Sequence, residues 1–239
     1  MSKKNMTNIN VTALPKDLLA KILMHALSNS IIDSVNGQLC CKAFHIASND
    51  DRIFKNVSME KFNFVSWCPR ERIFHKRCVA TKNAEALYKK GMVNLFSQRK
   101  SKSGLCCLKK VTEEGHVETI YAYGIILICL GGDLRKQRLQ IVSSLNLVNS
   151  SKRGSRTIAN CRSKIERFFS NIWVNFALTE LKQVDCSCDP GIRKNSMCSS
   201  SSEGKGWETT NDLSHCCDSS FWDRKATFFC RVLRKYLVA

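Results

Sequence analysis

Two stretches in the middle of the chain match each other when one is shifted by 33 residues. Residues 76–92 (KRCVATKNAEALYKKGM) align with residues 109–125 (KKVTEEGHVETIYAYGI), with basic residues, a Glu, a Tyr and a Gly in register. Asn83 and His116 fall opposite each other, where a turn would join the two helices of a pair. A period of about 33 residues is typical of stacked helix pairs. The period therefore predicts an all-α fold with antiparallel helix-pair repeats, arranged as a short solenoid.

The segment at residues 14–27 (LPKDLLAKILMHAL) predicts an apolar helix near the amino end. Pro15 suits the first position of a helix, because its ring fixes φ and its missing N–H costs nothing there. Two more short apolar stretches follow, at residues 31–46 and from Ile53. Three helices this short cannot bury all of their apolar surface among themselves. We therefore expect another protein to cover part of it; the alternative is that the three helices belong to the core of a larger α domain.

The same residues resemble an F-box. The resemblance is carried by Leu-Pro at 14–15, Asp-Leu at 17–18, Ile-Leu at 22–23, Cys-Lys-Ala-Phe at 41–44, and then Asp51 and Phe54. It implies a three-helix module that binds the Skp-type adaptor of a cullin–RING ubiquitin ligase, with apolar side chains laid into a groove of the adaptor. The resemblance assigns the adaptor contacts to Leu14, Pro15, Leu18, Leu19, Ile22, Leu23, Val35, Cys41, Phe44 and Phe54.

The repeated stretches resemble SEL-like repeats, which are relatives of the tetratricopeptide family. The matching cores are ALYKKG at 86–91 and YAYG at 121–124. Repeat arrays need about three units for stability, and about two are recognisable here. We therefore expect flanking helices at residues 62–67 and 164–181 to cap them. Taken with the F-box, the chain resembles a family of plant F-box proteins.

The expected domain organisation has four parts. They are a flexible tail at 1–12, the F-box at 13–59, the SEL-like repeat region at 60–185, and a partly disordered Cys-bearing tail at 186–239 with a terminal helix at 222–237. The net charge of +18 is concentrated in the repeat region, where residues 60–185 hold 23 Lys and Arg against 10 Asp and Glu. A positive field of this kind favours acidic partners, although it also serves solubility. We expect residues 97–103 and 149–156, which are basic and polar, to form surface loops.

The carboxyl-terminal tail is the one place where the sequence suggests metal chemistry. Its candidate ligands for zinc are Cys186, Cys188, His215, Cys216 and Cys217. Structural zinc sites normally take two Cys-rich pairs with two to four residues between the ligands. The tail has no C-x-x-C, and its candidate ligands are adjacent or separated by one residue. We therefore expect no cofactor, with a zinc site as the alternative.

The sequence contains no nucleotide-binding, metalloprotease or hydrolase signature, and its five His are scattered. We therefore expect a non-catalytic protein. Residues 1–11 are polar, which argues against a secretory signal. The longest apolar run, at 120–130, is shorter than the ~20 residues that a membrane span needs. We accordingly expect a protein of the cytoplasm, the nucleus or both, with a buried helix at this run.

These observations predict the substrate-recognition subunit of a Skp–cullin–F-box ubiquitin ligase. The F-box would bind the Skp-type adaptor, and through it the cullin, while the basic helical repeats would bind a protein target that the sequence does not identify. One alternative is a nucleic-acid-associated protein that uses the basic middle region. Its aromatic residues lie on apolar faces and are not interleaved with Lys and Arg, which argues against this alternative. The other alternative is a helical scaffold whose F-box serves no ligase.

Overall fold

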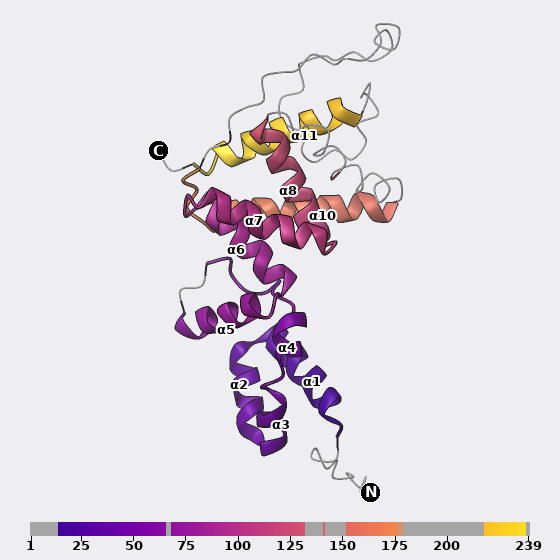
Figure 1. The fold of residues 1–239 in the computed structure, drawn as a ribbon, viewed down its shortest axis with the longest axis vertical. Helices are drawn as coiled ribbons and strands as arrows, with labels where there is room; N and C mark the ends of the chain where they lie inside the picture. Colours follow the sequence, from indigo (N-terminus) through magenta and orange to yellow (C-terminus); the bar gives the residue numbers. More distant parts are fainter. Residues whose placement is uncertain are drawn as a thin grey trace, which may run out of the picture. The chain divides into compact units, whose positions relative to one another are not determined.

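The computed structural model describes residues 14–65, 68–131, 141, 152–176, 178 and 218–237. Within these ranges the regular elements are helices, and the strand-like pairing is one isolated bridge between Val174 and Leu237 (Figure 1). The predicted all-α fold is therefore confirmed. The chain divides into two compact units, Met1–Leu87 and Tyr88–Ala239.

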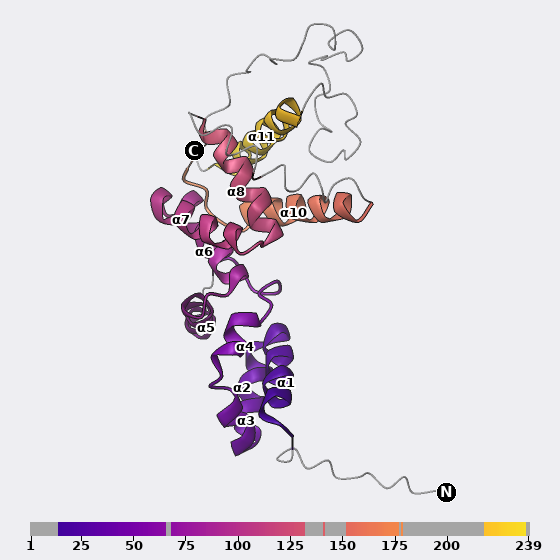
Figure 2. The same cartoon turned by 45° about the vertical axis from the view of Figure 1, so that its right-hand side comes forward.

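The first unit begins with four short helices, α1 (Lys16–Asn29), α2 (Ile31–Cys40), α3 (Lys42–Ala47) and α4 (Asp51–Asn56), and α1 packs against the other three (Figure 2). Local chemistry sets their ends. Pro15 occupies the N-cap of α1, one position before the predicted one. The side chain of Ser30 accepts the Asp33 N–H at 3.2 Å, and that of Asp50 accepts the Arg52 N–H at 2.9 Å, so both residues cap a following helix. Gly37 does not split α2, which is continuous.

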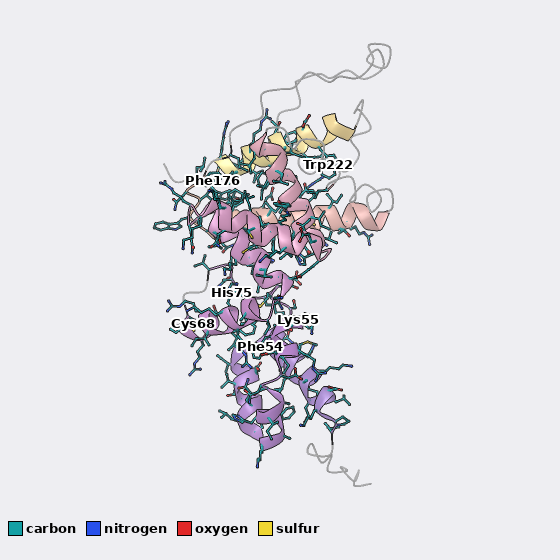
Figure 3. All side chains as sticks on the ribbon, in the orientation of Figure 1. Phe54, Lys55, Cys68, His75, Phe176 and Trp222 are labelled. Carbon is teal, nitrogen blue, oxygen red and sulfur yellow. The ribbon has the colours of Figure 1, made fainter. Side chains whose placement is uncertain are left out.

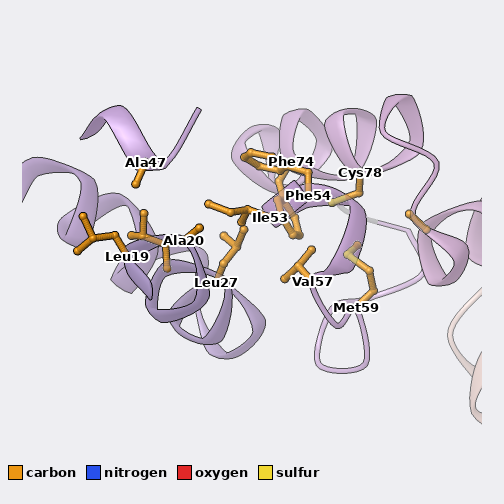
Figure 4. Packing of buried hydrophobic residues seen from close by; sticks show 12 residues of the cluster. Leu19, Ala20, Leu27, Ala47, Ile53, Phe54, Val57, Met59, Phe74 and Cys78 are labelled. Carbon is orange, nitrogen blue, oxygen red and sulfur yellow. The ribbon is translucent and has the colours of Figure 1, made fainter. Parts of the chain in front are cut away.

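The core of the first unit joins α1 and α4 to the next helix, α5 (Pro69–Ala80) (Figure 4). Its largest members are Leu19, Leu23, Leu27, Ile53, Phe54, Met59 and Phe74. The rings of Phe54 and Phe74 lie 6.2 Å apart, and the Arg77 guanidinium lies 3.8 Å from the centroid of the Phe54 ring. The predicted helix at 62–67 is wrong for residues 62–65, which are not helical, while 66 and 67 lie outside the described part. The helix begins instead at Pro69, which suits a first helical position.

The 33-residue period is confirmed helix by helix. Helices α5 and α6 (Ala84–Phe96) form the first pair in the sequence, and α7 (Ser101–Glu113) and α8 (Val117–Leu130) form the second. The first helix of each pair ends at Ala80 or Glu113, and the second begins at Ala84 or Val117, so these two inner boundaries recur after 33 residues, while the outer ends recur after 32 and 34. The few residues that the two stretches share in sequence thus mark equivalent positions in two similar helix pairs.

The turns inside the two pairs share the same backbone. Lys82 (φ 61°) and Gly115 (φ 81°) both adopt the left-handed conformation. The next residue donates its N–H to the equivalent carbonyl in each turn, from Asn83 to Cys78 at 2.9 Å and from His116 to Val111 at 3.3 Å. The two turns therefore end one helix and begin the next in the same way.

The second unit is built around α8, which packs against α7, α10 (Lys152–Ser170) and α11 (Asp218–Arg234). The apolar run at 120–130 lies in α8 and is mostly buried, as predicted. A cluster of aromatic rings holds the helices together, and its buried members are Phe96, Phe168, Phe169 and Phe229. Trp222 on α11 is fully buried as well, so the terminal helix contributes to this core (Figure 3). No helix within the described ranges has both the length and the apolar character that crossing a bilayer requires.

Three predicted boundaries in the second unit differ from the structure. The helix predicted at 164–181 is α10, which ends at Ser170, and the side chain of Trp173 is 77% exposed instead of belonging to the apolar stripe. The predicted loop at 97–103 is a turn over 97–100 followed by the first turn of α7. The predicted loop at 149–156 is helical from residue 152, and 149–151 lie outside the described part. The terminal helix predicted at 222–237 is also present, as α11, but it spans Asp218–Arg234.

Candidate functional site

Helix α1 is apolar on two sides, and only one of them is used by the fold. Leu19, Leu23 and Leu27 recur at helical spacing and are buried. Leu18 and Ile22 lie one turn apart on another face, and their side chains are 45% and 44% exposed. The helix therefore contributes to the core of the first unit and also presents an apolar strip to solvent.

Helix α2 presents a second apolar strip. Ile32 and Leu39 are seven residues apart, which places them on one helix face, and they are 62% and 77% exposed. Val35 lies between them at helical spacing and is half-buried. Eight large hydrophobic side chains are exposed in the described ranges, and five of them belong to α1–α3. These five are Leu18, Ile22, Ile32, Leu39 and Ile46. We call Leu18, Ile22, Ile32, Val35 and Leu39 the exposed strips of α1 and α2.

The structure divides the predicted adaptor contacts into three groups. Pro15, Leu18 and Ile22 are exposed, Leu14, Val35, Cys41 and Phe44 are half-buried, and Leu19, Leu23 and Phe54 are buried in the core of the first unit. A partner cannot contact the last three without unfolding the module, so they support the surface from within. Ile32, Leu39 and Ile46 were missed as surface residues, because the sequence shows only that they are apolar. The sequence did indicate that some apolar residues of these short helices must remain exposed, because helices this short cannot bury all of their apolar surface.

An ionic bridge fixes the start of α1 to the start of α4. The Arg52 guanidinium lies 2.8 Å from a carboxylate oxygen of Asp17 and 2.6 Å from one of Asp50. The hydrogen bonds from the Arg52 side chain and backbone lower the pKa of Asp50. The bonds to both carboxylates raise the pKa of Arg52. Because Arg52 and Asp17 are largely exposed, the bridge adds little stability.

Asn83 anchors the carboxyl end of α4 to the start of α6. Its side-chain nitrogen lies 3.0, 3.0 and 2.8 Å from the carbonyl oxygens of Phe54, Lys55 and Val57. Its side-chain oxygen accepts the Ala86 N–H at 3.0 Å. This buried residue therefore donates its two side-chain N–H groups among carbonyl oxygens at the end of α4 and just beyond it, and it caps α6. The sequence indicated only that Asn83 stands at a turn of the repeat.

A half-buried ionic cluster joins α8 to α10 in the second unit. The Glu118 carboxylate lies 2.8 Å from the Lys164 ammonium and 3.3 Å from a ring nitrogen of His116. Burial alone would raise the pKa of Glu118, but the hydrogen bond from Lys164 and the nearby positive charges outweigh it and leave that pKa lowered. The Arg162 side chain donates to the Tyr121 hydroxyl at 3.2 Å. Burial raises the pKa of Tyr121 to about 12.

The candidate zinc ligands Cys186, Cys188, His215, Cys216 and Cys217 lie outside the described residues. Within the described ranges, no three His, Cys, Asp or Glu side chains are grouped so that they could hold a metal ion. The structure does bring two thiols together, with the sulfur atoms of Cys129 and Cys230 3.5 Å apart between α8 and α11. The hydrogen bond with Cys230 and burial both raise the pKa of Cys129, so these thiols pack as uncharged apolar groups.

Comparisons with known proteins match both halves of this architecture. A family model of plant tetratricopeptide repeats matches residues 59–170, from the end of the F-box-like helices to the end of α10. The Arabidopsis thaliana F-box protein At2g35280 is 30% identical over 120 residues, which cover 50% of this chain and 74% of that protein. At1g67623 of the same plant, also named as an F-box protein, is 28% identical over 228 residues, which cover 90% of this chain and 75% of the relative. No solved structure matches the chain. The helical module with its exposed strips, the repeated helix pairs and these relatives together show that the chain belongs to the plant F-box proteins with tetratricopeptide-like helical repeats.

Proposed function

We propose that the protein is the substrate-recognition subunit of a Skp–cullin–F-box ubiquitin ligase. In this proposal the exposed strips of α1 and α2 bind the Skp-type adaptor, which connects the protein to the cullin. The helices of the second unit bind the protein target. The ligase chemistry belongs to other subunits, and this chain acts by raising the effective concentration of the target beside them.

The observation that carries the proposal is the exposure of Leu18, Ile22, Ile32 and Leu39. The first two lie on α1, whose other side forms the core, and the last two lie on α2, which packs against α1. Complete burial of an aliphatic side chain contributes roughly 1.5–3 kcal/mol to stability. Covering the exposed part of a half-exposed side chain therefore contributes about 1 kcal/mol. A module that leaves such side chains in water gains this energy only when a partner covers them. A helical groove is the kind of partner surface that accepts apolar side chains at helical spacing.

We also place the assembly in the cytoplasm or the nucleus. The nine Cys within the described ranges are free thiols, several of them exposed. Reduced exposed thiols persist in the reducing compartments of the cell. Fractionation of plant cells that express a tagged full-length chain tests this placement, and recovery of the protein from the secreted fraction would contradict it.

Co-expression with a plant Skp-type adaptor tests the adaptor assignment. The parent protein should co-elute with the adaptor in size-exclusion chromatography, and the double variant Leu18→Glu with Ile22→Glu should elute alone. Lys21→Glu is the matched control, because Lys21 is exposed on the same helix and the charge change is the same. Co-elution of the double variant, or no complex with the parent protein, would refute the proposal.

A further inference from the structure

The exposed face of α7 and the turn before it carry a group of positive charges in the described second unit. Gly104, Leu108 and Val111 are the buried residues of this helix. On the opposite side, Lys102, Cys106 and Lys109 recur at intervals of four and three residues and are exposed. Lys110 flanks this line, and Arg99 and Lys100 stand in the preceding turn; all three are exposed. We call Arg99, Lys100, Lys102, Lys109 and Lys110 the basic face of α7.

None of these five cations forms an ion pair with another residue that the structure describes. Elsewhere the chain does neutralise cations: Arg52 is held by two carboxylates, and Lys164 is held by Glu118. The basic face therefore keeps its full charge available for a partner.

The charges at the start of α7 are placed against the stability of the helix, whereas Lys110 lies in its last turn, where a cation is favourable. A helix favours negative side chains in its first turn and positive ones in its last turn, because of its dipole. The first turn of α7 has no acidic residue, and Arg99, Lys100 and Lys102 surround it. Glu113 and Glu114, both exposed, occupy the carboxyl end. Helix stability does not account for the cations at the start of α7 or for the carboxylates at its end, whereas recognition of a charged partner does.

Resting on the proposed function, we propose that the basic face of α7 binds an acidic, extended segment of the target protein. Lys102 and Lys109 are separated by about 10 Å along the helix, given a rise of about 1.5 Å per residue. An extended chain advances about 3.3 Å per residue, so a run of three or four Asp or Glu spans this distance. Glu113 and Glu114 limit the run, because they repel further acidic residues and favour a Lys or Arg there.

The same features argue for a peptide over a nucleic acid. A phosphate backbone is a continuous polyanion, and along this helix it would meet the carboxylates of Glu113 and Glu114. Single strands bind by stacking bases on aromatic side chains, and α7 contains no aromatic residue. Along α7 the lysines come first and Glu113 and Glu114 follow, which matches a peptide whose acidic residues are followed by a Lys or Arg.

The test is fluorescence anisotropy of the full-length protein with a labelled peptide, Gly-Ser-Glu-Asp-Glu-Glu-Ser-Gly-Lys-Gly. The triple variant Lys102→Glu, Lys109→Glu and Lys110→Glu should weaken binding by about tenfold or more. The matched control, Lys90→Glu, Arg156→Glu and Arg167→Glu, makes the same charge change at exposed positions of α6 and α10 and should weaken it by less than about threefold. A neutral triple variant with Gln at the three α7 positions provides the same comparison if the Glu variant does not fold.

Equal losses in the α7 and control variants would overturn the proposal, because the peptide would then sense only the net charge. A parent protein that ignores the peptide but binds a short DNA duplex would overturn it too. The α7 variants should still co-elute with the Skp-type adaptor. Loss of adaptor binding by every protein, parent included, refutes the proposed function, whereas loss of peptide discrimination alone refutes this inference.

Discussion

At the scale of the residue, Asn83 is the side chain on which the junction between α4 and α6 depends. Asn83→Ala removes the donor to three carbonyl oxygens and the cap of α6, and should lower the free energy of unfolding by about 2–3 kcal/mol. Asn83→Asp keeps the cap but turns a carboxylate toward the carbonyl oxygens, and should cost more at neutral pH than in acid. Urea denaturation measures both. Asn63→Ala, at an exposed position, should stay within about 0.5 kcal/mol of the parent.

Introducing a glycine in one repeat turn and removing one from the other, at the equivalent position, should change stability in opposite directions. Lys82 pays for a left-handed backbone that Gly115 adopts freely at the same place in the next pair. Lys82→Gly should therefore raise stability by about 0.5–1 kcal/mol, and Gly115→Ala should lower it by about 1 kcal/mol. A Cβ at Gly115 meets no atom within 4 Å, so its effect is one of backbone conformation alone. Thermal denaturation of both variants measures the pair, and changes of the same sign would contradict the explanation.

At the scale of the element, the crossing of α6 and α7 depends on two glycines. A Cβ at Gly104 would lie 2.8 Å from the Gly91 carbonyl oxygen and 2.9 Å from the Leu95 backbone nitrogen, so the backbone itself would have to move. Gly104→Ala should lower stability by about 1–3 kcal/mol. A Cβ at Gly91 mainly meets the Leu108 side chain, which can adjust, and its effect should be smaller. Exposed Cys106→Ala on α7 is the control, and a loss as large as that of Gly104→Ala would contradict the crossing.

The pairing of α8 with α10 through Glu118 predicts an acid-sensitive contribution to stability. Because the pKa of Glu118 is lowered below its ordinary value of 4.5, the folded state favours the carboxylate. This contribution is present above about pH 4.5 and is lost as the pH falls through the lowered folded pKa. Glu118→Gln should thus be less stable than the parent at neutral pH, with a smaller further loss on acidification. Urea midpoints across the acid range measure this, with exposed Glu114→Gln as the control; an unchanged acid loss in Glu118→Gln would contradict it.

Sequence patterns predicted elements better than they predicted which side of an element is buried. The 33-residue period located the turns of both helix pairs, because a repeated turn needs repeated residues at its ends. On α1, by contrast, Leu18 and Leu19 are the same residue type, and only packing within the core of the first unit decides that Leu19 is buried. The same reason explains Trp173, which continues the apolar pattern of α10 in sequence but follows the end of the helix.

At the scale of the whole molecule, the proposed function assigns different tasks to the two units. In this proposal the exposed strips of α1 and α2 in the first unit bind the adaptor, and the basic face of α7 in the second unit binds the target. The sequence placed the boundary between the F-box and the repeat region at residues 59 and 60, whereas the compact units divide between Leu87 and Tyr88, so α5 and the start of α6 belong to the first unit. The relatives and helix pairs show the family. The extent of the second unit was not predictable, because α11 joins its core from a position more than 80 residues after α8 in the chain.

Calorimetric titration of a plant Skp-type adaptor into the full-length protein tests the central claim, that the exposed strips and not the buried leucines bind the adaptor. Leu18→Glu with Ile22→Glu should weaken the affinity by about 100-fold while leaving the melting temperature near that of the parent. Leu19→Ala should lower the melting temperature, since it creates a cavity, and should bind the adaptor within about threefold of the parent when folded. Parental affinity in the Leu18 and Ile22 double variant would contradict the account.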